Sequence, residues 1–168
     1  MKLHYQTLLP QQYSKFSRVW IYQSARIFSI QEALEIESRL EQFAVNWKSH
    51  GDPVEATGLL LFRRFIIFIA DESKVAVGGC STDASVREIK NIEKEFSVSL
   101  FDRTQLSFFI KDKIEILPLA QLNYALEKNF LTKDTLYFNN TVQTLEELKT
   151  NWIIPIEKSW LEQKIAKA

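Results

Sequence analysis

The sequence predicts an α+β protein in which helices pack on a mostly antiparallel sheet. Two segments carry apolar residues at helical spacing, and several short runs are rich in β-branched and aromatic residues. Turn residues separate these runs. The order of strand, helix, strands and helix resembles a split β-α-β arrangement of the ferredoxin-like type, followed by C-terminal helices. The chain of 168 residues fits one domain, 1–168, with no linker or internal repeat.

The first predicted elements are a strand and a long helix. Residues 18–23 are β-branched and aromatic, as strands require. Residues 29–32, Ser-Ile-Gln-Glu, fit a capping box, so a helix should follow and end near the glycine and proline of residues 50–53. Its apolar face consists of Ala33, Ile36, Leu40, Phe43, Ala44 and Trp47.

Residues 54–71 form the apolar centre of the chain. Arg63-Arg64 divides them into two strand-length runs, which favours a hairpin; a single long, bent strand is the alternative. A third short strand is expected at residues 75–77. Neighbouring residues of a strand point to opposite faces of the sheet, and in these runs the residues of both faces are apolar. Both faces of the sheet should therefore be covered, the second by the C-terminal helices or by a partner subunit.

The second half continues with helices and strands. A helix should begin close to Ser81, Thr82 or Asp83, all good N-cap residues. The later expectations are two strands within 106–117 around a turn at 111–113, a helix from Pro118, a loop at Asn139-Asn140, a capping box at 144–147 whose helix ends at Trp152, and a last amphipathic helix over 156–165.

Composition excludes several classes of protein. Twenty-one basic residues balance twenty-one acidic ones, which argues against nucleic-acid binding and against an anionic membrane surface. The longest apolar stretch is too short to span a bilayer and contains two arginines. A single cysteine, Cys80, rules out an intramolecular disulfide and cysteine-based metal sites. With no apolar signal segment near the start, the expected location is the cytoplasm, and no cofactor or metal is expected.

The glycine turn at residues 78–83 is the one stretch where chemistry is expected. Glycines permit close backbone approach, and a helix N-terminus follows with unpaired amides. Gly79, Cys80, Ser81, Thr82 and Asp83 are therefore the predicted ligand-binding residues, with a small anion as ligand. Asp83 opposes this, because its carboxylate repels anions.

Two other interpretations of this turn remain open. Cys80 is a candidate nucleophile, since a helix N-terminus activates a thiol, but the sequence places neither His4 nor His50 nearby as a base. Alternatively, Cys80 is a small buried residue and Ser81-Thr82-Asp83 is an ordinary cap.

Four weaker candidates each have a structural alternative. Arg63-Arg64 pairs with an acidic ligand, or is a solvated hairpin tip. The glutamates of the first helix bind metal, or form a solvated face. Trp20, Tyr22 and Arg26 line a pocket, or belong to the core. Trp152 and Trp160 anchor an interface, or pack helices onto the sheet. The glutamates are Glu32, Glu35, Glu37 and Glu41.

Several segments together resemble a family of short bacterial proteins that is often labelled "ABC transporter ATPase". They are residues 19–24, 43–51, 70–72, 79–83 and 101–103. The resemblance spans most of the chain and implies no particular activity. The label conflicts with the sequence, because a P-loop needs G-x-x-x-x-G-K-[ST] and no lysine follows Gly78-Gly79 at the required place.

These observations favour a non-catalytic cytoplasmic domain that binds a small ligand or a protein partner, as a monomer or homodimer. The alternative is a thiol-dependent enzyme that uses Cys80 at a helix N-terminus.

Overall fold

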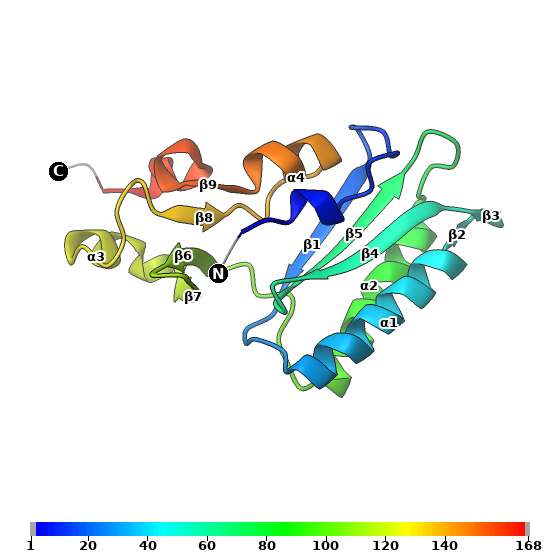
Figure 1. Ribbon diagram of the computed structural model, residues 1–168, viewed down its shortest axis with the longest axis horizontal. Helices are drawn as coiled ribbons and strands as arrows, with labels where there is room; N and C mark the ends of the chain where they lie inside the picture. The colour runs from blue at the N-terminus through cyan, green and yellow to red at the C-terminus, as the bar shows by residue number, and fades with distance from the viewer. Residues whose placement is uncertain (1–2, 167–168) are drawn as a thin grey trace.

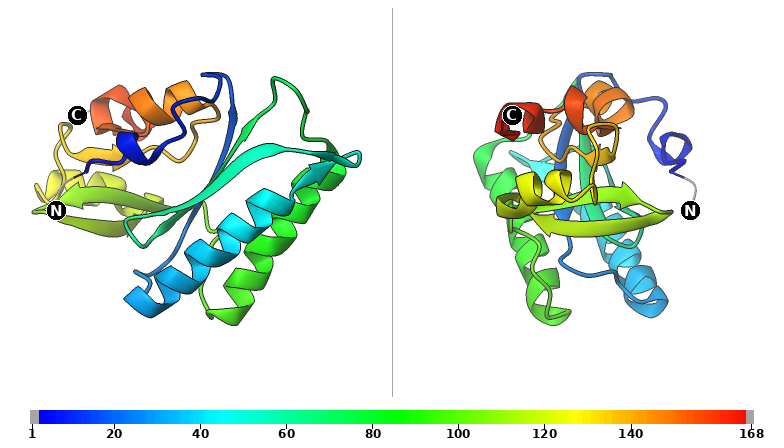
Figure 2. Two further views of the ribbon diagram at one scale, coloured as in Figure 1. Left: turned by 45° about the vertical axis from the view of Figure 1, so that its right-hand side comes forward. Right: turned by 90° about the vertical axis from the view of Figure 1, so that its left-hand side faces the viewer.

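A computed structural model describes residues 3–166 as two antiparallel sheets with helices packed against them (Figure 1). The α+β class is therefore confirmed. The first sheet carries helices α1 (Ile30–Asn46) and α2 (Gly79–Glu95) on one face, and the C-terminal half of the chain lies on its other side (Figure 2).

The first sheet consists of β1 (Arg18–Gln23), β5 (Phe65–Asp71) and β4 (Glu55–Leu61), in the order β1-β5-β4. A ferredoxin-like core would add a fourth strand beside β1. Within residues 3–166 the corresponding edge carries only one isolated bridge, between Arg18 and Thr144. The ferredoxin-like arrangement is thus not confirmed.

The β4–β5 hairpin is confirmed, and the alternative of one long strand is wrong. Its turn works without glycine because Phe62 and Arg63 adopt the left-handed region, with φ of 54° and 50°. Two backbone hydrogen bonds offset the strain of these left-handed residues, because they fix the turn to the segment before α1. The amides of Ser24 and Phe28 donate to the carbonyls of Arg64 and Arg63, each at 2.8 Å.

Strand β5 is buried along its whole length because both faces of the sheet are covered. Ile66, Phe68 and Ala70 pack towards α1 and α2. Phe65, Ile67 and Ile69 pack towards α4 (Leu145–Asn151) and the N-terminal segment around the short helix η1 (Gln6–Leu8). The expectation of a doubly covered sheet is confirmed, with parts of this chain as the cover.

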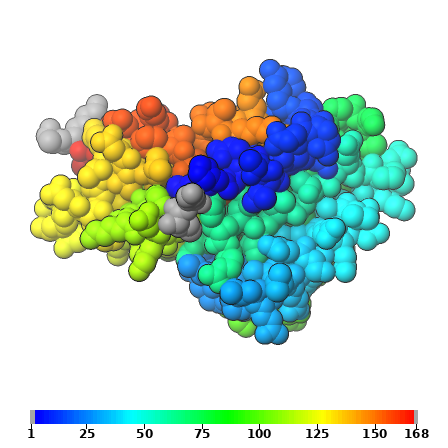
Figure 3. Space-filling model, viewed as in Figure 1, coloured from blue at the N-terminus to red at the C-terminus, as the bar shows by residue number. Residues whose placement is uncertain are grey.

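The N-terminal segment contributes to this second layer. Figure 3 shows it lying across the surface between α4 and β4. The buried Tyr5 hydroxyl donates to the carbonyl of Leu148 at 2.7 Å, which ties the segment to α4.

The second sheet has the order β7-β6-β8-β9 and packs with the C-terminal turns around a separate apolar cluster. Its strands are β6 (Gln105–Ile110), β7 (Lys113–Pro118), β8 (Leu136–Phe138) and β9 (Ile153–Pro155); the short helices are η2 (Leu119–Gln121), α3 (Leu122–Glu127), η3 (Ile156–Lys158) and η4 (Trp160–Lys164). A two-stranded ribbon, β2 (Lys48–Ser49) with β3 (Asp52–Pro53), follows α1.

Four sequence-based expectations about the elements are wrong. Helix α1 ends at Asn46, short of residues 50–53, because the chain continues into the β2–β3 ribbon. Residues 75–77 form no strand, because the Glu72 carboxylate accepts from the Val77 amide where a neighbouring strand would have to bond. Helix α2 begins at Gly79, before the expected start. The last helix is two short 3₁₀ turns divided at Ser159, whose hydroxyl donates to the Ile156 carbonyl and accepts from the Leu161 amide.

Both predicted capping boxes are confirmed, at Ser29 with Glu32 and at Thr144 with Glu147. None of the helices within residues 3–166 has the length and apolar character needed to cross a membrane.

Alanine substitutions at two glycines, Gly58 in β4 and Gly79 in α2, test the packing of α1 on the sheet. A Cβ added at Gly58 would lie 2.9 Å from the Leu40 Cβ, whereas one at Gly79 would meet nothing within 4 Å. We expect Gly58→Ala to lower the free energy of unfolding by about 1–3 kcal/mol through overpacking. Gly79→Ala should leave stability unchanged or raise it by up to about 1 kcal/mol. Urea unfolding of the two variants checks this, and equal midpoints would contradict it.

Candidate functional site

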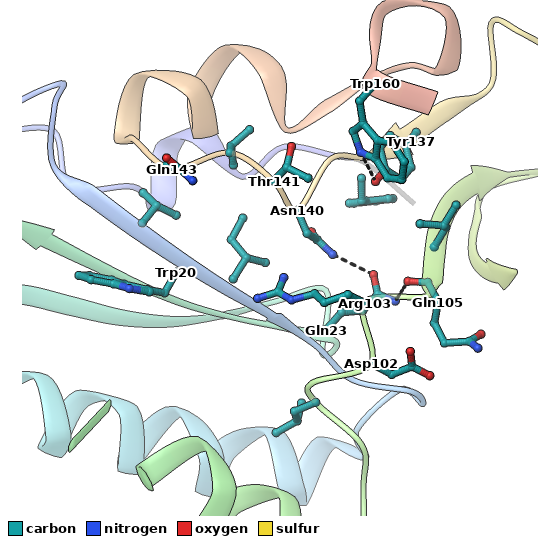
Figure 4. A pocket seen from close by; sticks show the side chains of 16 residues that line it. Trp20, Gln23, Asp102, Arg103, Gln105, Tyr137, Asn140, Thr141, Gln143 and Trp160 are labelled. Carbon is teal, nitrogen blue, oxygen red and sulfur yellow. Dashed lines mark hydrogen bonds between the residues drawn. The ribbon is translucent and has the colours of Figure 1, made fainter. Parts of the chain in front are cut away.

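A cavity of about 520 Å³ lies between the two sheets, beside the outer edge of β1 (Figure 4). The cavity exists because that edge has no strand partner in the part of the chain that the structure describes. The loop before α4 covers only the start of β1, where the Val19 amide donates to the Gln143 carbonyl at 2.9 Å. Beyond that point, residues 100–106, the loop at 137–143 and Trp160 surround the opening.

A chain of hydrogen bonds crosses the cavity wall from one sheet to the other. The Trp152 indole donates to Asn140 Oδ1 at 3.0 Å, and Asn140 Nδ2 donates to Gln23 Oε1 at 3.0 Å. Gln23 Nε2 then donates to the Gln105 carbonyl at 3.1 Å. Gln23 is only 8% exposed. Since these side chains already satisfy one another, they fix the shape of the cavity.

Arg103 is the cationic side chain of this cavity. Figure 4 shows it extending below Asn140 in the direction of Trp20. It is exposed, and no hydrogen bond or ion pair joins it to any residue of the described chain. Its charge acts to lower the pKa of the Tyr22 and Tyr137 phenols, against the larger effect of burial. The guanidinium is therefore available to an incoming group.

Asp102, the neighbouring acid, is occupied elsewhere. Its carboxylate accepts from the Thr104 hydroxyl at 2.6 Å and from the Thr104 amide at 2.9 Å, and these bonds lower the pKa of Asp102. The resulting turn holds the carboxylate away from Arg103 (Figure 4).

Aromatic side chains form two walls of the cavity. Trp20 stands at one end, with its ring 5.6 Å from that of Trp47. Tyr137 and Trp160 stand at the other end, where the Trp160 indole donates to the Tyr137 hydroxyl at 3.2 Å. Burial raises the pKa of Tyr137 to about 12. The phenol is consequently neutral at ordinary pH and presents no negative charge to a ligand.

The glycine turn predicted as a ligand site lies elsewhere, at the start of α2. Gly79, Cys80 and Asp83 are exposed there. The hydroxyls expected to bind an anion are used within the protein: Ser81 donates to the Lys48 carbonyl at 2.7 Å and Thr82 to the Gly78 carbonyl at 3.1 Å. Ligand binding by these residues stays a prediction.

Two expectations about this turn are corrected. Cys80 is exposed, so its interpretation as a buried residue is wrong. The N-cap is Gly78, which has no side chain to cap the helix, so the ordinary-cap interpretation is also wrong. The fold also brings His50 close, because a Cβ added at Gly78 would lie 3.1 Å from His50 Nε2. The sequence alone gave no sign of this proximity.

The expected trio of Trp20, Tyr22 and Arg26 does not converge. Trp20 lines the cavity, Tyr22 is buried in the core, and Arg26 forms an ion pair with Glu32 at 2.8 Å. The Glu32 carboxylate is therefore already bound by Arg26. Residues 3–166 contain no cluster of side chains that could hold a metal ion.

The two C-terminal tryptophans have different roles. Trp152 is fully buried against Phe65 and Phe138, so it packs the fold together. Trp160 is half-buried and lines the cavity.

Sequence inspection missed most of the cavity. Asn140 was expected only as a loop residue, and Gln23 only as the end of a strand. A polar side chain closing an apolar strand is a weak signal that could have drawn attention to Gln23.

Comparison of the chain with protein-family models, with curated proteins and with solved structures gave no match.

Tyr137 gives the cavity a measurable pH signature. Its folded pKa of about 12 lies above the ordinary value of about 10, so between these pH values the unfolded chain loses a proton that the folded chain keeps. The stabilisation is complete below pH 10, and unfolding then becomes easier by about 1.4 kcal/mol per pH unit up to pH 12.

Denaturant midpoints measured from pH 9 to 12 test this effect. Burial also raises the pKa of Tyr5 to about 12, so Tyr137→Phe is needed to isolate the contribution of Tyr137. The variant should show a shallower alkaline decline than the wild type. Trp160→Phe should raise the pKa of Tyr137 further, because the indole N–H stabilises the phenolate. An unchanged alkaline slope in Tyr137→Phe would contradict the assignment.

Proposed function

We propose that this protein is a non-catalytic binding domain whose ligand is a small organic anion held in the cavity between the sheets. The observation that carries the proposal is the Arg103 guanidinium, which extends into an aromatic-walled cavity without an acidic partner among the described residues. An arginine in this position suits a carboxylate or phosphate, because its planar fork donates two parallel hydrogen bonds.

The size and the walls of the cavity support a small molecule. A volume of about 520 Å³ falls in the usual range for ligand sites. The Trp160 ring at one end favours a ligand with a planar ring, and at the other end stands Trp20, whose ring the Arg18 guanidinium covers on one side at 4.6 Å. We therefore assign the ligand to the class of aromatic carboxylates and ring-bearing phosphates.

The lining supports binding rather than catalysis. Gln23 and Asn140 use their polar atoms on each other, and the Asp102 carboxylate is held by Thr104. The lining contains no histidine or cysteine to act as a base or nucleophile. The proposal includes the cytoplasm as the location and a monomer or homodimer as the state.

A thermal-shift screen tests the proposal. Salicylate, indole-3-acetate and a nucleoside monophosphate serve as anionic probes, with salicylamide as a neutral analogue of the first. A ligand that binds only the folded state raises its melting temperature. We expect at least one anion to stabilise the wild type, while salicylamide does not.

Arg103→Gln should weaken that binding about ten- to a hundredfold, the range expected for losing a charge-assisted hydrogen bond. Arg87→Gln is the matched control, because Arg87 is an exposed arginine of α2 outside the cavity. No response to any probe would reject the small-ligand proposal and favour a protein partner. Equal loss in both variants would show that only net charge matters.

A thiol-dependent enzyme is the second candidate, and the observation that favours it is His50 beside the start of α2, near the exposed Cys80. No hydrogen bond joins the two side chains in the described structure. If the protein is non-catalytic, Cys80 should react with iodoacetamide at the same rate in wild type and in His50→Gln between pH 5 and 9. A rate that falls severalfold in His50→Gln would favour the enzyme.

A further inference from the structure

The arginine pair at the β4–β5 turn is divided between two environments. Arg63 is exposed and donates to the Phe28 carbonyl at 3.1 Å. Arg64 is only 6% exposed. The interpretation of the pair as a solvated hairpin tip is thus wrong for Arg64, which carries its charge into the protein.

The buried guanidinium is incompletely satisfied. Arg64 Nη1 donates to the Ser24 carbonyl at 3.3 Å, while Nε is buried without a hydrogen-bond partner among the described residues. No acidic side chain of residues 3–166 lies within ion-pair distance of it. Burial lowers the pKa of Arg64, and the nearby Glu115 opposes this only in part. A charge buried in this way is costly unless a counter-charge completes it.

Arg64 lines a second cavity, of about 540 Å³, between the β4–β5 turn and the start of β7. Figure 1 shows this turn on the side of the first sheet that is nearest to β6 and β7. Apolar and charged side chains line the walls of this cavity, and its cationic side chains outnumber its acidic ones. The apolar residues are Ile27, Leu60, Phe62 and Ile114; the charged ones are Arg63, Arg64, Lys113, Asp112 and Glu115.

The backbone around Arg64 is held in place before any ligand arrives. The carbonyls of Arg63 and Arg64 accept the amides of Phe28 and Ser24, so the turn is fixed at both residues. Ile27, 48% exposed, stands between these two anchor points and belongs to the cavity wall. A ligand that enters past Ile27 meets apolar side chains and a fixed cation, and binding to a fixed group loses less conformational entropy.

We propose that this cavity is a second binding site, in which Arg64 binds the carboxylate of a small amphiphilic acid and the apolar walls hold its hydrocarbon part. The carboxylate supplies the counter-charge that the guanidinium lacks among residues 3–166. A hydrocarbon body is favoured over a bare inorganic anion because four apolar side chains line the same space. This site is separate from the cavity at Arg103 and does not rest on its proposed function.

The test is a titration of the ¹⁵N-labelled full chain with hexanoate, followed by amide chemical shifts. We expect the shifts to centre on the amides of residues 24–28, 62–65 and 113–115. Hexanamide, which has the same body without the charge, and inorganic phosphate, which has charge without the body, should each bind at least about tenfold more weakly.

Arg64→Met should lower hexanoate affinity at least about tenfold, since methionine keeps much of the side-chain volume without the charge. Arg87→Gln, at an exposed arginine outside both cavities, should leave it unchanged. Unchanged binding in Arg64→Met, or equal binding of hexanamide, would overturn the proposal.

Glu115→Gln gives a readout that does not depend on how Arg64→Met folds. Removing a carboxylate from the cavity wall should tighten hexanoate binding at least about twofold, because a like charge no longer opposes the anion. Weaker or unchanged binding in Glu115→Gln would contradict an anion site at Arg64.

Discussion

The packing of both faces of β5 is the constraint on which the rest of the structure depends. All seven of its residues are buried, so each face needs its own apolar layer. Helices α1 and α2 supply one layer, and Trp152, α4 and the N-terminal segment supply the other. Because the second layer comes from distant parts of the chain, burying β5 also draws the second sheet against the first.

The cavity at Arg103 follows from the same constraint. The segment that leads into α4 runs beside β1 without forming a strand. Within residues 3–166 it pairs with β1 only at the bridge between Arg18 and Thr144. The outer edge of β1, which beyond the Arg18–Thr144 bridge has no strand partner among residues 3–166, leaves room for a cavity that Trp20 and Gln23 line. The hydrogen bonds from Trp152 to Asn140 and from Asn140 to Gln23 then hold this cavity open.

Much of the first half could be predicted from sequence because its signals are local. The capping box at Ser29 and the paired apolar runs around Arg63-Arg64 each depend on neighbouring residues. Strands β8 and β9 could not be predicted because three residues carry no periodicity, and because α4 separates the two paired segments in the chain. The cavity was missed for the same reason: Arg103, Asn140 and Trp20 meet only in the folded state. Arg64 shows the converse, since sequence singled out the pair but could not reveal which arginine is buried.

The tryptophan arrangement makes the cavity optically visible. Trp20 and Trp160 line it, Trp152 is bonded to its wall through Asn140, and Trp47 is in edge contact with Trp20. All four indoles of the chain are therefore in the wall of one cavity or within one contact of it. Emission from Trp20 and Trp160 accordingly reports the polarity of the cavity. An occupant whose absorbance overlaps the tryptophan emission would quench these two indoles by energy transfer.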